Sequence, residues 1–275
     1  MKRILTTVAV ATLVAGTAWA QEQPSTDGPV DPASMNATYT LSGSANFTVA
    51  ISESGNLSRL RTPAGPNPGE YEHIFVGTPA EGYAVCQVAN TYADFGSFTG
   101  PSIGWGAPAC IAGACGGAGS SVTIRRISTD GRWQLDQKWT RDTAERDVTV
   151  QMTLVNRTAG AQAGVQILRY ADLDISNTTF PDFWEKTNVA VTAVDQTRNA
   201  AVTLSALTIP KYATGTFIST SCCPAPTCVP TAPLATLPAP GGVEANGDFS
   251  AWVFYSIGNI SPGGKVIVKY NYQAH

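Results

Sequence analysis

Alternating hydrophobic and polar positions run through most of this chain and indicate β-strands. The clearest pair of strands flanks Asp130-Gly131, a dipeptide that favours the positive φ angles of a tight hairpin turn. In the second strand of this pair, Trp133, Leu135 and Trp139 fall on one face, because successive side chains of a strand point to opposite sides. We therefore expect this face to be buried in the core.

The same alternation predicts most of the remaining fold. We expect strands at 47–51, 72–77, 82–88, 121–128, 132–141, 147–156, 164–175, 188–194, 201–207, 249–257 and 265–272. The short segment 78–81 predicts a hairpin between the two strands that flank it. Because the connections are too short for crossover helices, we expect an all-β fold, a large antiparallel β-sandwich of two packed sheets.

Two segments break the alternation: 94–120 is rich in glycine and 219–247 is rich in proline. Each contains cysteines, and neither predicts a strand. We interpret both as long surface loops stapled by disulfides. Such loops on a rigid sheet are the usual place for binding sites.

The N-terminus has the pattern of a secretory signal peptide. Lys2 and Arg3 precede an apolar run at 4–15 and a small-residue cleavage site that ends at Ala20. The apolar run is shorter than the roughly 18 to 20 residues that span a bilayer, and no later stretch is long and apolar enough. We expect a secreted or periplasmic protein without a transmembrane segment after cleavage. An uncleaved N-terminal anchor is the alternative.

The expected organisation is a signal peptide at 1–20, a flexible tail at 21–34 and a single β-sandwich domain at 35–275. The chain has 17 basic and 20 acidic residues, a formal net charge of −3 at pH 7, and no basic patch; the closest basic clusters are Arg125-Arg126 and Arg59 with Arg61. This composition excludes a nucleic-acid partner. Charged residues make up only 13% of the chain, which is typical of an extracellular β-protein and not of a helical cytosolic enzyme.

An even number of cysteines favours disulfides in an oxidising compartment. We expect bridges among all six: Cys86, Cys110, Cys115, Cys222, Cys223 and Cys228. Gly113 lets the chain turn between Cys110 and Cys115, and Cys223 and Cys228 have the same spacing, which would leave Cys86 to pair with Cys222. Six cysteines allow fifteen pairings, so the connectivity stays open. A zinc site at the three C-terminal cysteines is the alternative.

Acidic side chains gather at the end of the strand predicted at 164–175. Tyr170, Asp172 and Asp174 alternate onto one face and Arg169 onto the other. Two carboxylates on one face repel, so a cation, a basic partner or solvent should compensate them. The alternatives are a solvated edge or a pairing with Arg141 or Arg146, a Ca²⁺ site that Asn177 completes, and a carbohydrate-binding or catalytic role. No cofactor other than Ca²⁺ is expected.

Aromatic residues in the predicted loops are candidates for stacking on sugar rings. Trp184 and Asp182 lie in an aromatic and acidic segment at 180–186, and Trp105 lies in the glycine-rich segment. Aromatic faces contact the C–H faces of sugars while neighbouring carboxylates bind the hydroxyls. The alternative is that these rings plug the core beneath a loop.

His73 and Glu81 are brought near one another by the predicted hairpin at 72–88. A histidine and a carboxylate in contact can transfer a proton. The alternative is a surface histidine that is merely hydrogen-bonded.

Three segments carry a resemblance to a known family: the strand 147–156, the strand end Arg169-Tyr-Ala-Asp-Leu-Asp174, and the closing strand at 262–272. Together they resemble the β-supersandwich of galactose-mutarotase-like domains. The resemblance implies a large antiparallel sandwich. The chain also resembles secreted bacterial proteins of unknown function.

Three functions follow as hypotheses. The first is a non-catalytic protein that binds carbohydrate or another cell-surface ligand through its long loops. The second is a carbohydrate-active enzyme, lyase-like or epimerase-like, that uses acidic residues with His73. The third is a structural or adhesive surface protein. Convergence of His73, Glu81 and Asp172 in one pocket would favour the enzyme.

Overall fold

The computed structural model describes residues 38–43, 47–63, 70–74, 81–87, 90–95, 102–141, 145–177, 183–196, 198–208, 211–219, 243–245 and 249–275. The expected signal peptide and tail, Asp182, and the three C-terminal cysteines lie outside these residues. Within the described part, the regular structure is β-strand apart from the short 3-10 turn η2 (Ile175–Asn177), which confirms the all-β class. No helix in that part is long and apolar enough to cross a membrane.

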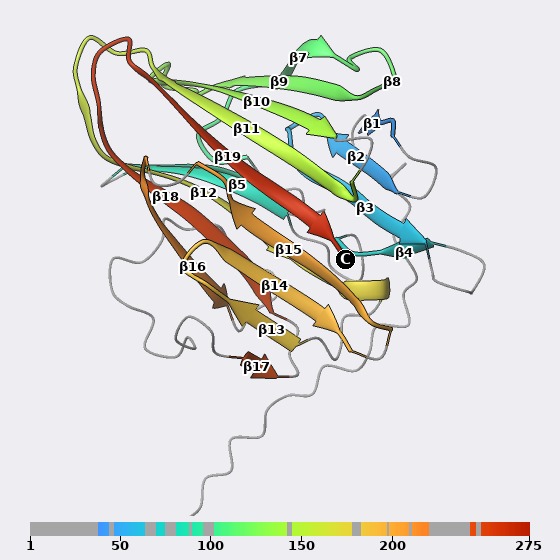
Figure 1. The fold of residues 1–275 in the computed structure, drawn as a ribbon. Coiled ribbons are helices and arrows are strands. Elements are labelled where there is room, and N and C mark those ends of the chain that lie inside the picture. Colours follow the sequence, from blue (N-terminus) through green and yellow to red (C-terminus); the bar gives the residue numbers. More distant parts are fainter. Residues whose placement is uncertain are drawn as a thin grey trace, which may run out of the picture.

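A nine-stranded sheet forms one layer of the molecule. Its strands, in order across the sheet, are β17 (Val243–Ala245), β13 (Phe183–Lys186), β14 (Ala190–Asp195), β15 (Ala200–Ala206), β19 (Lys265–Ala274), β11 (Asp147–Asn156), β10 (Trp133–Arg141), β9 (Ser121–Ile127) and β7 (Ala109–Gly113). Figure 1 shows this sheet running from β7 at the top to β17 at the bottom, with β19 near its middle. Neighbouring strands pair antiparallel throughout.

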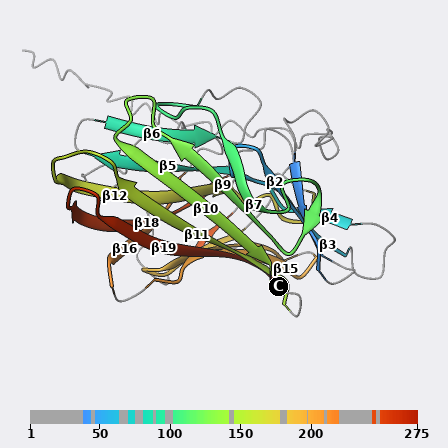
Figure 2. The same cartoon turned by 90° about the horizontal axis from the view of Figure 1, so that it is seen from above.

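Two five-stranded sheets pack against one face of this layer (Figure 2). The first contains β16 (Ala213–Ser219), β18 (Ser250–Ile260), β12 (Gln162–Asp172), β5 (Glu81–Gln87) and β6 (Asn90–Phe95). The second contains β4 (Glu70–Glu72), β3 (Leu57–Pro63), β2 (Thr48–Ser52), β1 (Thr38–Leu41) and β8 (Ala118–Gly119). The sandwich is confirmed, but it is built from three hydrogen-bonded sheets and not from the two expected.

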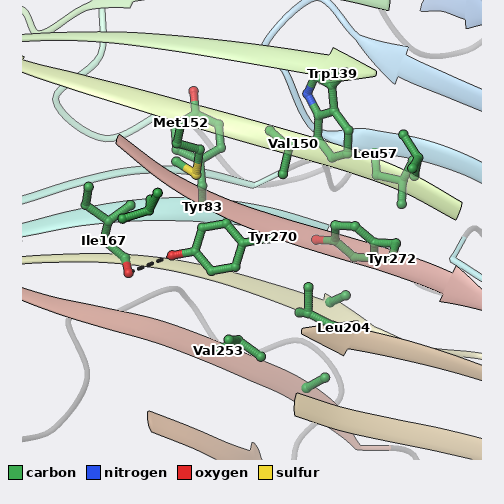
Figure 3. Packing of buried hydrophobic residues seen from close by; sticks show 14 of the residues in the cluster. Leu57, Tyr83, Trp139, Val150, Met152, Ile167, Leu204, Val253, Tyr270 and Tyr272 are labelled. Carbon is green, nitrogen blue, oxygen red and sulfur yellow. Dashed lines mark hydrogen bonds between the residues drawn. The ribbon is translucent and has the colours of Figure 1, made fainter. Parts of the chain in front are cut away.

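One large apolar core joins the layers. Met152 of β11, Leu204 of β15 and Tyr270 of β19 meet Val253 of β18 and Ile167 of β12 (Figure 3). The Tyr270 hydroxyl donates a hydrogen bond of 2.8 Å to the carbonyl oxygen of Ile167, so this buried polar group is satisfied across the layers.

The hairpin predicted at Asp130-Gly131 is confirmed. β9 and β10 pair antiparallel, and Gly131 has the positive φ of 72° that its position in the turn requires. Trp133, Leu135 and Trp139 are all 0% exposed, as their shared face predicts.

The hairpin predicted at 72–88 is wrong. β4 pairs with β3, where Glu72 lies opposite Arg61, whereas β5 pairs with β12 and β6 in a different sheet. Glu72 and Glu81, which look like polar positions near a turn, are both buried and bonded to arginines. The pairing of β4 with β3 and of β5 with β12 and β6 therefore overrides the local turn signal.

Strands also occur where no alternation predicts them. The glycine-rich segment contains β7 and β8, the aromatic segment at 180–186 contains β13, and the proline-rich segment contains β17. β7 lies at a sheet edge with four of its five residues exposed, and it carries a register shift. Because an exposed edge strand has no buried face, its sequence lacks the hydrophobic period on which the prediction depends.

One predicted disulfide lies wholly in the described residues and is confirmed: Cys110 and Cys115 are bonded, with their Cα atoms 5.6 Å apart. Gly113 between them has a φ of 82°, and a Cβ there would lie 2.2 Å from the carbonyl oxygen of Ser121. Only glycine fits this turn. Cys86 is also disulfide-bonded, and its pairing with Cys222 stays a prediction.

Candidate functional site

Successive residues of β12 point into two different interiors of the protein. Arg169 points between the layers, where it contacts residues of the nine-stranded sheet. Leu168 and Tyr170 point to the opposite face, where they belong to a second, smaller apolar cluster. Both faces of this strand are therefore covered.

Arg169 and Glu81 form a fully buried ion pair. The Arg169 guanidinium donates to Glu81 at 2.9 Å, to the Gln137 side-chain oxygen at 2.8 Å and to the Tyr272 hydroxyl at 3.1 Å. It also lies 4.6 Å from the ring centroid of Trp139. Although burial opposes the charge, the Glu81 carboxylate raises the pKa of Arg169, so the guanidinium stays protonated.

Glu81 is occupied by this network. Besides Arg169, its carboxylate accepts the backbone N–H of Leu57 at 2.6 Å and the hydroxyl of Tyr272. These bonds tie β5, β3, β12 and β19 together, which is a structural role. The sequence signal for it was an arginine inside an otherwise apolar strand.

His73 is buried at 1% exposure, so the surface-histidine alternative is wrong. Its Nδ1 accepts the backbone N–H of Ser176 at 3.2 Å, which places the ring proton on Nε2, where it is donated to the Thr62 hydroxyl at 2.7 Å. Ser176 holds this position with a φ of 63°, an uncommon backbone conformation for serine. Burial lowers the pKa of His73 to about 4, although Asp195 opposes the shift.

A pH dependence of stability follows from His73. The unfolded chain takes up a proton near pH 6.5, whereas the folded chain does so only near pH 4, so stability is fully present above pH 6.5 and is lost as the pH falls. Between pH 7.5 and pH 5 we expect the free energy of unfolding to fall by about 2 kcal/mol from this group. Urea unfolding at both pH values measures it.

The two histidines of the chain provide a matched control for this prediction. His73→Gln should flatten the slope of stability against pH, while substitution of the exposed His275 by Gln should leave it as in the wild type. An identical slope in both variants would contradict the assignment.

Asp172 and Asp174 are each 2% exposed, so the solvated-edge alternative is wrong. Asp172 is the last residue of β12, and the backbone N–H of Asp174 donates to the carbonyl oxygen of His73 at 3.1 Å. Arg141, one proposed partner, donates to the carbonyl oxygen of Leu41 at 3.0 Å. Across the described residues, no group of three or more His, Cys, Asp or Glu is placed to hold a metal ion. A Ca²⁺ site here stays a prediction.

The aromatic candidates lie inside the protein. Trp184 packs against Phe249, with ring centroids 6.2 Å apart, and Trp105 packs against Tyr83 and Tyr92. Both tryptophans are buried, so they fill the core, as the alternative interpretation predicted.

Tyr170 is also buried. It contacts Trp252, which stacks on Phe217 with a centroid separation of 4.7 Å. These rings, with Cys86, belong to the cluster that covers the outer side of β12 and β18. The three candidate rings, Trp105, Trp184 and Tyr170, are therefore all buried and offer no free face to a sugar.

A second buried ion pair lies near the glycine-rich segment. Arg126 donates to Asp94 at 2.9 Å, and the side-chain amide of Asn56 donates to the same carboxylate at 2.6 Å. Ser102 bonds to both charged residues. Ser102 lies in the sequence Gly-Pro-Ser-Ile-Gly, which has the spacing of a hydrolase nucleophile motif. In that motif a helix follows the serine, whereas here isolated β-bridges at Ile103 and Trp105 follow it.

Polar side chains line the outer side of the nine-stranded sheet, where five of the nine named below are half-buried, three are exposed and Asn271 is buried. The strand register places them in two rows: Ser121, Thr140, Thr149, Asn271 and Ser205, and then Thr123, Lys138, Gln151 and Lys269. We call these nine side chains the outer polar face. The sequence did not predict this face. Each of these residues occupies an ordinary polar position of an alternating strand, and only the pairing register aligns them across five strands.

Contacts within the outer polar face are few. Thr149 donates to the side-chain oxygen of Asn271 at 3.0 Å, and the amide of Asn271 donates to Asp147 at 3.3 Å. Thr140, Lys138 and Lys269 are exposed. The face therefore presents hydroxyl, amide and ammonium groups on a rigid sheet.

No family model and no curated protein matches the chain. Among solved structures, it is similar to a galactose mutarotase-like protein from Lactobacillus casei, with 11% identity, a TM-score of 0.48, and coverage of 87% of this chain and 100% of that one. A galactose mutarotase related enzyme from Lactobacillus acidophilus has 9% identity, a TM-score of 0.44, and coverage of 87% and 97%. A bacterial glucoamylase complexed with acarbose has 7% identity, a TM-score of 0.49, and coverage of 87% and 33%.

The likeness is to galactose mutarotase-like proteins. It agrees with the resemblance carried by the strand pattern of the sequence. With these identities and with TM-scores below 0.5, it carries no argument about activity.

Proposed function

We propose that this chain is an exported, non-catalytic β-sandwich protein that binds carbohydrate on its outer polar face. The observation that carries the proposal is the alignment of hydroxyl and amide side chains across adjacent strands of the nine-stranded sheet. This site differs from the long loops favoured by the sequence, and it uses none of the buried aromatic candidates.

The chemistry of the face suits sugars. Serine, threonine, asparagine and glutamine side chains both donate and accept hydrogen bonds, as sugar hydroxyls do. Adjacent strands lie roughly 4.8 Å apart, so the rows offer such groups at a regular spacing. Because the sheet holds them in place, less conformational entropy is lost on binding than for groups on a mobile loop.

The non-catalytic part of the proposal rests on the interior. Glu81 is held by Arg169 and Tyr272, and His73 is held by Thr62 and Ser176. An acid or base engaged in this way is poorly placed to exchange protons with a substrate. These contacts argue against the enzyme alternative.

Export is supported by the basic, apolar and small-residue pattern at 1–20 and by the Cys110–Cys115 disulfide, a bond typical of oxidising compartments. Expression with the native leader should yield a mature chain that begins at Gln21, which mass spectrometry of the exported protein checks. Recovery of the full-length chain from the membrane fraction would contradict it.

Carbohydrate binding is tested by removing hydroxyl and amide groups from the outer polar face. The triple variant Thr140→Val, Thr149→Val and Gln151→Leu should weaken binding about tenfold or more, because each lost hydrogen bond contributes roughly 0.5–1.5 kcal/mol. Isothermal titration calorimetry of the mature protein against polysaccharides selected on a glycan array measures it. Thr214→Val, in β16 of another sheet, is the control and should bind as the wild type does.

A further inference from the structure

Three lysines on the outer side of the nine-stranded sheet give the outer polar face and its surroundings a local positive charge. Lys138, Lys265 and Lys269 are exposed and occupy the outward positions of β10 and β19. From these positions we propose that the ligand of the outer polar face is an acidic polysaccharide, a polymer of carboxylate-bearing uronate sugars. The inference rests on the proposed carbohydrate-binding function and specifies its ligand class.

The register fixes the spacing of these charges. Lys138 and Lys269 both lie opposite Gln151, on the two strands that flank β11. Two strand spacings place their Cα atoms about 10 Å apart. Lys265 precedes Lys269 by four residues on the same side of β19, about 14 Å away along the strand. A polymer that carries a carboxylate on successive sugars can meet two or three of these ammonium groups at once.

The charges of these lysines remain available to a ligand. No ion pair among the described residues involves any of the three. By contrast, the neighbouring Arg125 donates to Asp136 at 2.7 and 2.6 Å, so these two charges largely cancel. Since the whole chain has a formal net charge of −3, this positive region lies on a protein that is otherwise negative. An anionic ligand would be guided to it.

The groups between the lysines favour a uronate polymer over other polyanions. Gln151 separates Lys138 from Lys269, and Thr123 flanks Lys138, so amide and hydroxyl groups alternate with ammonium groups. Sugar hydroxyls and carboxylates match that alternation. A single-stranded nucleic acid would also require aromatic rings to stack on its bases, and the outer polar face has none.

The test uses charge reversal with polygalacturonate as the probe. The double variant Lys138→Glu and Lys269→Glu should lower the affinity of the mature protein for polygalacturonate by about tenfold or more, and added salt should weaken wild-type binding. Lys211→Glu, an exposed position that precedes β16, should stay within about twofold of the wild type. Melting curves of the variants should match, because these side chains lie on the surface.

The outcomes separate this inference from the proposed function. If a neutral galactan binds as tightly as polygalacturonate and the charge reversal has no effect, the acidic-ligand inference is overturned while carbohydrate binding stands. If dextran sulfate or polyphosphate binds as tightly as polygalacturonate, charge alone decides and the inference is overturned as well. If no glycan binds, the proposed function fails and the inference fails with it.

Discussion

Removing one partner of the Arg169–Glu81 pair should destabilise the protein by about 3–5 kcal/mol, because the other charge is left buried without compensation. Glu81→Gln and Arg169→Met are the two changes, and chemical denaturation of each variant at pH 7 measures the loss. Arg169 is especially sensitive because its bonds to Gln137 and Tyr272 would be lost together. In a Glu81 variant, the Tyr272 hydroxyl and the backbone N–H of Leu57 would also lose the carboxylate that accepts their hydrogen bonds.

The partly exposed pair Arg125–Asp136 is a control. It also joins an arginine to a carboxylate by two hydrogen bonds, but it lies on the outer side of the sheet, so Arg125→Met should cost less than about 1 kcal/mol. A double-mutant cycle on Arg169 and Glu81 should show strong coupling. If Glu81→Gln instead left stability unchanged and abolished a measured activity, the carboxylate would be functional and the non-catalytic proposal would be wrong.

Trp139→Ala should cost roughly 3–5 kcal/mol, since it leaves a large cavity in the core between the layers. The ring is 0% exposed, packs 6.0 Å from Tyr272 and donates its Nε1–H to the carbonyl oxygen of Gly55 at 3.1 Å. The variant would also remove the aromatic face beneath Arg169. Urea denaturation gives the change in the free energy of unfolding.

The neighbouring residue Thr140 supplies the control for this prediction. It follows Trp139 on the same strand but points outward, so Thr140→Ala should change stability by less than about 1 kcal/mol. Equal losses in the two variants would show that the effect arises from the strand and not from the buried ring.

The local chemistry of the sequence determined a large part of this fold. The alternation in β9, β10, β11 and β19 gave the strands and their buried faces, and Asp130-Gly131 gave the hairpin, because these signals depend only on neighbouring residues. The spacing of Cys110 and Cys115 gave their disulfide for the same reason. The all-β class followed from these patterns.

Tertiary structure decided the fate of the charged and aromatic residues. Glu81 and His73 are polar in sequence and were candidate site residues, yet both are buried: Glu81 is paired with Arg169 on another strand, and burial keeps His73 neutral. Alternation identifies the two sides of a strand, but it cannot say that both sides of β12 are covered, because that depends on what packs there.

The outer polar face is a second feature that the sequence alone could not predict. Lys138 and Lys269 lie more than a hundred residues apart in the sequence, so no local pattern groups them. The register of β10, β11 and β19 brings them to either side of Gln151. Local periodicity determined that each side chain points outward, and only long-range strand pairing determined which of them stand together, because a one-residue slip in register would move every side chain to the other face.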